Sequence, residues 1–177
     1  MGHQYISLGA ACNAATMMKI AGLRRASYPF DWLLNLEDGL TAVTAIINDD
    51  FKEISSADCY EVVHYAQVGS AVPVYRQYPR TYHVHSDPRQ NQDAHEDMVR
   101  RCDRLRQVLK STDHLHFVYY RNLSACRGDR SGVSAATVYE QMTAEASQFL
   151  STISSRRRGK TSLLLILEAD DEDTNEA

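Results

Sequence analysis

Hydrophobic residues recur along the chain with two spacings, one typical of helices and one typical of strands. Apolar side chains three or four positions apart predict helices at about residues 12–21, 36–47, 94–110 and 135–153. Alternating or continuous runs of β-branched and aromatic residues predict strands at about residues 4–8, 60–63, 72–75, 81–85, 115–120 and 161–167. This mixture of elements predicts a single α/β or α+β domain.

Two of the predicted helices have a clear apolar face and a candidate N-cap. The helix at 36–47, with Asn35 as its cap, carries Leu36, Leu40, Val43 and Ile47 on one side. The helix at 94–110, with Asp93 as its cap, carries Met98, Cys102, Leu105 and Leu109. We expect both faces to be buried.

Composition narrows the classes of protein to consider. The 177 residues are 44% hydrophobic and 24% charged, which is typical of one globular domain, here expected over residues 1–168, with an acidic, disordered tail at 169–177. The net charge of −4 argues against a nucleic-acid partner, because such proteins carry a basic surplus. The longest apolar run, Leu163–Leu167, is too short to span a membrane.

The four cysteines, Cys12, Cys59, Cys102 and Cys126, are far apart and form no C-x-x-C motif. No signal-peptide pattern precedes them. We therefore expect reduced thiols and a cytoplasmic location.

Cys12 is the first candidate for chemistry. It follows a predicted strand and the turn at Gly9, and it begins a predicted helix. Unpaired N–H groups and the positive end of the helix dipole at such a position favour a thiolate and can stabilise an oxyanion. The alternative is that Cys12 is a small, inert core residue, which is common for cysteine.

A nucleophilic cysteine needs a base, and two H-x-H pairs are available. His83 and His85 end a predicted strand, and either could lie at the rim of a cleft. His114 and His116 begin another strand, so the two pairs could instead lie side by side and bind a transition metal, with Asp87 as a possible acidic ligand. The other candidates, His3, His64 and His95, are expected to be exposed or simply polar.

The segment Ser27–Trp32 places three aromatic rings around a proline and an acid. We expect Phe30 and Trp32 to cover the core, while Asp31 pairs with Arg24, Arg25 or Arg121. This structural role is favoured over a catalytic one, because a buried acid paired with arginine commonly serves structure.

These motifs together resemble the opening signature of a family of papain-like cysteine peptidases whose function is not characterised. The resemblance rests on Ile6–Cys12, Gly22–Arg24 and Ser27–Trp32. A weaker second block comprises a strand ending in His, a helix with several arginines, and the strand Phe117–Arg121. The similarity covers about residues 4–123.

The resemblance implies a papain-like α+β fold, in which a helix with the cysteine at its N-terminus packs on a small mixed or antiparallel sheet that bears the histidine. Carried over by position, Cys12 would be the nucleophile. His85 would be the base, with His83 as the alternative, because His85 is nearer the turn and is followed closely by an acid. The group that orients the base stays open among Asp31, Asp87 and Asn122.

The resulting functional hypothesis is a cysteine hydrolase, of peptidase or amidase type, or a thiol acyltransferase. It would act on a peptide, isopeptide or other acyl substrate and would need no cofactor or metal. One alternative is a catalytically inactive papain-like module that binds or regulates a partner. The other is the metal protein built on the two H-x-H pairs. The sequence leaves the oligomeric state open.

Overall fold

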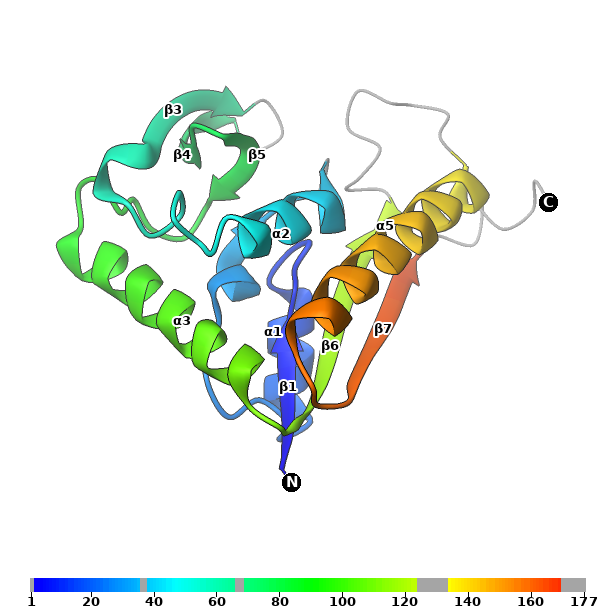
Figure 1. Cartoon of the computed structure of the whole chain (residues 1–177). Coiled ribbons are helices and arrows are strands. Elements are labelled where there is room, and N and C mark those ends of the chain that lie inside the picture. Colours follow the sequence, from blue (N-terminus) through cyan, green and yellow to red (C-terminus); the bar gives the residue numbers. More distant parts are fainter. Residues whose placement is uncertain (1, 36–37, 66–68, 124–133, 170–177) are drawn as a thin grey trace.

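The computed structural model describes residues 2–35, 38–65, 69–123 and 134–169 (Figure 1). It contains two separate β-sheets and, within these ranges, four α-helices. The predictions made for Leu36, for Cys126 and for the tail at 170–177 lie outside the described residues. The α+β class is confirmed.

The first sheet is parallel and has three strands in the order β1-β6-β7. Its strands are β1 (His3–Ser7), β6 (His114–Asn122) and β7 (Thr161–Glu168). Because all three run in the same direction, their carboxyl ends lie at one edge of the sheet.

The second sheet is antiparallel and has four strands in the order β2-β5-β4-β3. Its strands are β2 (Leu33–Leu34), β3 (Tyr60–Tyr65), β4 (Ser70–Tyr75) and β5 (Tyr78–His83). The short strand β2 directly follows the 3-10 helix η1 (Pro29–Trp32), and a second 3-10 helix, η2 (Ala57–Cys59), precedes β3. The aromatic segment thus leads straight into this sheet.

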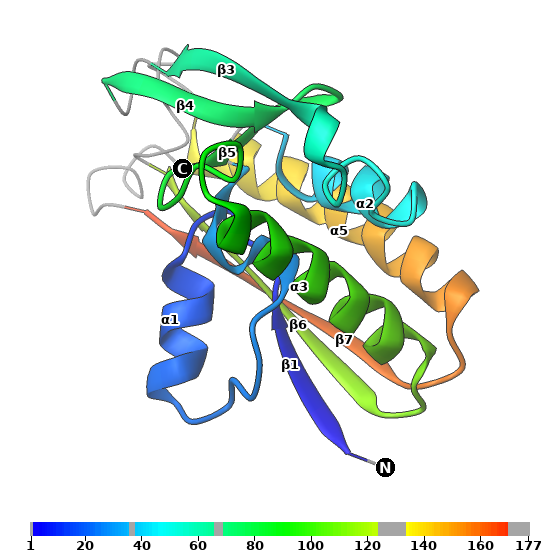
Figure 2. The same cartoon turned by 90° about the vertical axis from the view of Figure 1, so that its left-hand side faces the viewer.

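Alternation along β6 divides the parallel sheet into two faces. Leu115, Phe117 and Tyr119 belong to the main core, together with buried residues of α2 (Gly39–Asn48), α3 (Gln92–Lys110) and α5 (Ala135–Arg156). Val118 and Tyr120 pack instead with buried residues of α1 (Asn13–Ile20). Figure 2 shows α1 on one side of the sheet and α3 and α5 on the other.

The predicted apolar faces are confirmed where the structure describes them. Met98, Cys102, Leu105 and Leu109 of α3 are all buried, as are Leu40, Val43 and Ile47 of α2. Full burial of one such aliphatic side chain contributes roughly 1.5–3 kcal/mol to folding. These faces attach α2 and α3 to the core.

Both predicted N-caps are wrong. The cap of α3 is Asn91, whose Oδ1 accepts from the Ala94 N–H at 3.2 Å, so the helix starts before Asp93. Helix α2 begins at Gly39 after Asp38. Asn35 is buried and donates to the Leu8 carbonyl at 3.3 Å, which ties it to the turn before α1 rather than to a helix start.

The strand predicted at 81–85 ends at His83, because β5 pairs with the two residues of β2 and His83 is the last partner in that register. None of the helices in the described ranges combines the length and apolar character needed to cross a bilayer.

Candidate active site

Cys12 is the N-cap of α1 and is half-buried. The turn before it is fixed to the end of β6, because the Ala10 N–H donates to the Tyr120 carbonyl at 2.7 Å and the Tyr120 N–H donates to the Gly9 carbonyl at 2.9 Å. The Cys12 carbonyl accepts from the Thr16 N–H at 2.9 Å, which closes the first turn of the helix. The thiol therefore stands at the carboxyl edge of the parallel sheet, beside the first free N–H groups of a helix.

Gly9 allows a close approach within this turn. Its φ is +94°, and a Cβ there would lie 2.6 Å from the Asn35 Oδ1. The Asn35 N–H also donates to the Ala10 carbonyl at 3.0 Å. Asn35 therefore joins the Cys12 turn to the chain that has just left β2.

The chain segment just before Asn35 also contacts the strand that carries the histidines. In the register of the antiparallel sheet, Leu33 of β2 pairs with His83 of β5. Just beyond this pair, the rings of Trp32 and His85 meet edge to face, with centroids 5.8 Å apart. The segment from Trp32 to Asn35 therefore contacts both the turn that holds Cys12 and the end of the histidine strand.

The aromatic segment is anchored by a buried ion pair. Asp31 is fully buried and accepts from the Arg24 Nη2 at 2.5 Å and Nε at 3.1 Å, and from the Tyr28 N–H at 3.0 Å. Burial raises the pKa of Asp31, and the hydrogen bonds from Arg24 oppose that rise. The Arg24 guanidinium also lies 5.5 Å from the centre of the Trp32 ring. The predicted Asp31–Arg pairing is confirmed, and its effect is to hold Trp32 beside His85.

The two histidines of the H-x-H pair have different surroundings. His85 is exposed, whereas His83 is buried and its Nε2 lies 2.7 Å from the Tyr75 hydroxyl. Burial lowers the pKa of His83 to about 4, while Asp87 raises it and Arg101 lowers it further. His83 is therefore neutral at physiological pH.

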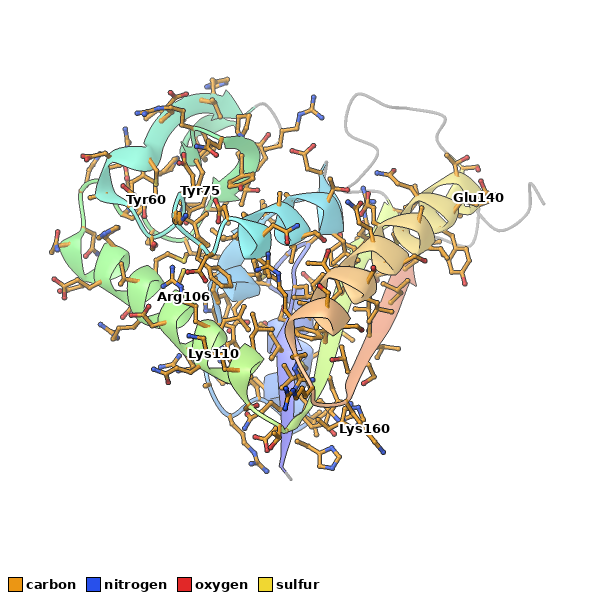
Figure 3. The ribbon with its side chains drawn as sticks, in the orientation of Figure 1. Tyr60, Tyr75, Arg106, Lys110, Glu140 and Lys160 are labelled. Atoms are coloured by element: carbon orange, nitrogen blue, oxygen red, sulfur yellow. The ribbon has the colours of Figure 1, made fainter. Side chains whose placement is uncertain are left out.

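The rings of Tyr75 and its neighbour Tyr60 both pack against the ring of His83. Their ring centroids are 5.3 Å apart, and the Tyr60 hydroxyl lies 3.1 Å from Nδ1 of His95 on α3. Both tyrosines are labelled in Figure 3. Neither tyrosine belongs to the motifs that point to the candidate site. The available signal is alternation, because Tyr75 lies on the face of β4 opposite Val72 and Val74, the face toward the core.

An open cavity of about 470 Å³ lies between the end of β5 and the start of α3. It is lined by Trp32, both histidines of the H-x-H pair, Met98 and polar residues of the α3 region, including Asp93, Asp97 and Arg101. Within this lining, Arg101 Nη2 lies 3.3 Å from Asp97 Oδ2. Cys12 does not line this cavity.

The three candidates for an orienting group are all engaged elsewhere. Asp31 binds Arg24, and Asp87 accepts from the Arg89 N–H, Nε and Nη2, the last at 2.6 Å, which lowers the pKa of Asp87. Asn122 donates to Glu168 Oε2 at 3.0 Å. In the described residues, none of the three forms a hydrogen bond with His85. The contact made by its ring is the one with Trp32.

The two H-x-H pairs do not lie side by side as predicted. His83 belongs to β5 of the antiparallel sheet, whereas His114 and His116 belong to β6, whose partners in the described ranges are β1 and β7. Among the described residues, the group of potential metal ligands around His114 and His116 includes neither His83 nor His85, so the predicted four-histidine site is wrong. The reason is that sequence spacing specifies which residues share a strand but not which strands share a sheet.

The state of His83 leads to a prediction on the pH dependence of stability. Since its pKa is lower in the folded protein than the usual 6.5, the stability that the neutral ring contributes is complete above about pH 6.5 and is lost as the pH falls toward about 4. We expect this one group to cost about 3 kcal/mol across that range. Urea unfolding of the wild type and His83→Gln at both ends of the range measures the difference.

The control for this prediction is His64→Gln, since His64 is exposed on β3. It should keep the pH dependence of the wild type. The interpretation would be contradicted if His83→Gln lost as much stability on acidification as the wild type.

Comparison with known proteins agrees with the family suggested by the sequence motifs. The sequence model of one family, described as "Putative papain-like cysteine peptidase (DUF1796)", matches residues 3–161. No curated protein and no solved structure shows significant similarity to the chain. The matched range includes Cys12, both histidines of the H-x-H pair and the aromatic segment.

Proposed function

The chain belongs to this family of papain-like cysteine peptidases, and from that premise we propose that it is a thiol-dependent hydrolase or acyltransferase in which Cys12 is the nucleophile and His85 the base. The observation that carries the proposal is the position of the Cys12 thiol at the start of α1, on a turn joined through Asn35 to the strand pair that ends at His83. His85 follows that strand by two residues.

The assignment of His85 rather than His83 rests on burial and bonding. A base in this reaction must take up a proton near neutral pH. His83 is poorly suited, because burial lowers its pKa to about 4 and its Nε2 already contacts the Tyr75 hydroxyl. His85 is exposed and lines the cavity, where its ring is accessible to a bound substrate.

Trp32 is the positioning residue in this proposal. Its ring packs perpendicular to that of His85, and it is itself held by the Arg24–Asp31 pair. An aromatic ring limits the orientations of an exposed imidazole and shields its proton transfer from water.

The reaction follows from these roles. His85 takes the proton of the Cys12 thiol, and the sulfur attacks the acyl carbon of the substrate. Free N–H groups at the start of α1 stabilise the oxyanion that forms. His85 then gives its proton to the leaving amine, alcohol or thiol, which leaves a thioester on Cys12. Water, or an acceptor in a transferase, attacks that thioester while His85 accepts a proton, and the thiolate is released with the second product.

The cavity suggests where the substrate is bound. It lies directly beside His85 and presents Arg101, Asp93 and Asp97 to a ligand, next to the apolar surfaces of Trp32 and Met98. We propose that it binds the portion of a peptide or other acyl substrate next to the bond that is cleaved. Its mixed charges favour an extended, polar chain with an occasional apolar group.

The rate at which iodoacetamide alkylates Cys12 tests the proposed pair. We expect Cys12 to react quickly near neutral pH and His85→Ala to slow that reaction at least about 10-fold, because a neighbouring imidazole promotes formation of the thiolate. Cys59 and Cys102 provide internal references, since burial raises the pKa of each to about 12. Peptide mapping by mass spectrometry gives the rate for each site.

The matched control is His64→Ala, which removes an exposed histidine of β3 that does not line the cavity. It should leave the alkylation rate unchanged. Equal rates in the wild type and His85→Ala would show that His85 does not activate the thiol.

A further inference from the structure

A second group of histidines lies at the opposite end of the molecule's parallel sheet from the Cys12 turn. In the register of β1 and β6, His3 pairs with His114, and Tyr5 pairs with His116. Alternate residues of β6 share a face, so His114 and His116 project to the same side, and His3 joins them from the neighbouring strand. Two strands that are more than 100 residues apart in the sequence thus bring three imidazoles together.

The distances within this group suit a metal ion. One ring nitrogen from each histidine lies within 4.8 Å of those from the other two. The Nδ1 of His3 and the Nε2 of His116 are 2.8 Å apart, and the rings of His114 and His116 have centroids 3.9 Å apart. Ligands at the usual Zn–N distance in a tetrahedral site are about 3.3 Å apart, so small ring rotations would complete the geometry.

The ring of His116 is also held by residues outside the histidine group. Its other nitrogen, Nδ1, lies 2.8 Å from the Ser162 hydroxyl on β7, which leaves Nε2 directed at His3. Its ring also stacks on Tyr5 with centroids 4.6 Å apart. Histidines that bind metals characteristically use one nitrogen for the metal and hydrogen-bond the other, and this bond fixes the tautomer and the ring.

The ligand types indicate which metals the group would bind. Three imidazoles without a carboxylate exclude Mg²⁺ and Ca²⁺, which prefer oxygen ligands, and favour zinc and the neighbouring transition metals.

We propose that His3, His114 and His116 bind one zinc ion, with the fourth coordination position open to solvent. The ion would replace the hydrogen bond between His3 and His116 and would link β1 to β6 at the amino ends of the strands. This site shares no residue with the cavity at His85, so it is independent of the proposed acyl chemistry.

Isothermal titration of chelator-treated protein with zinc tests the proposal, using a protein without an added histidine tag. We expect one zinc ion per chain and at least about 100-fold weaker binding in His116→Ala, because loss of a direct ligand should exceed the 10–100-fold cost typical of outer contacts. Ser162→Ala should weaken binding by roughly 10-fold through loss of the ring's orientation. Cobalt substitution adds a visible spectrum that reports tetrahedral nitrogen ligands.

Two further variants keep the test decisive. His3 is exposed at the start of β1, so His3→Ala preserves the fold and should weaken zinc binding as well. His64→Ala should bind zinc like the wild type. The proposal would be overturned if the wild type bound no zinc, or if Cys12→Ser abolished binding while His3→Ala and His116→Ala retained it. Alkylation of Cys12 should be unaffected by His3→Ala, so failure of either proposal can be recognised separately.

Discussion

Replacing Cys12 with serine is expected to reduce acyl-transfer turnover by at least about 10⁴-fold. A hydroxyl is a far weaker acid than a thiol, so His85 alone cannot generate the corresponding alkoxide near neutral pH. The substitution changes one atom at a half-buried N-cap, and serine is itself a favourable N-cap residue. The thermal unfolding temperature should therefore stay close to that of the wild type while the activity disappears.

The measurement is hydrolysis of a panel of thioesters, activated esters and peptide amides by wild type and variant. Cys12→Ala provides a second variant that lacks any nucleophile and should behave in the same way. If Cys12→Ser retained wild-type turnover of a substrate that the wild type cleaves, another residue would have to be the nucleophile.

Replacing His85 with alanine is expected to lower turnover by about 10²–10⁴-fold, the range typical of a general acid–base group. The same residue both activates the thiol and protonates the leaving group in the proposed mechanism. The loss should therefore be largest for amides, whose leaving groups need a proton, and smallest for thioesters. Parallel rates on these two substrate types measure this difference.

His64→Ala is the matched control and should have the wild-type rate on both substrate types. His83→Gln separates the two members of the H-x-H pair. If that variant lost turnover by 10²-fold or more near neutral pH, with an unchanged fold, while His85→Ala did not, the roles assigned here would be reversed.

The local structure follows largely from the sequence. The apolar positions of α3 recur at helical spacing and are buried, and the strand–turn–helix around Gly9 was evident because that turn precedes a helical pattern. The pairing of Asp31 with Arg24 could also be expected, since an acid within a buried aromatic segment needs a cation. These features depend on residues close together in the chain.

The remaining features depend on pairings between distant segments. Strand β2 has only two residues, too few for any hydrophobic period to appear, yet it places Trp32 beside His85. His3 was expected to be merely exposed, and only the register of β1 with β6 brings it to His114 and His116. The different burial of His83 and His85 likewise arises where β5 ends, which is set by β2 and not by the sequence of β5.

The cap of α2 illustrates the same limit. Asn35 has the residue type of an N-cap and precedes a helical pattern, so local rules assign it to the helix. Its side chain and backbone instead contact Leu8 and Ala10, which lie about 25 positions earlier. Asn35 therefore joins the Cys12 turn to the chain that leaves β2, a contact that local rules do not predict.

An acyl group bound covalently to Cys12 can be trapped and detected. The wild-type protein is mixed with a thioester or activated ester, quenched in acid within the first turnover and digested for mass spectrometry. We expect the peptide containing Cys12 to gain the mass of the acyl group, the adduct to decay as product appears, and Cys12→Ser to gain none. Turnover of the substrate with no adduct on Cys12, or an adduct of the same yield in Cys12→Ser, would contradict the assignment of Cys12 as the nucleophile.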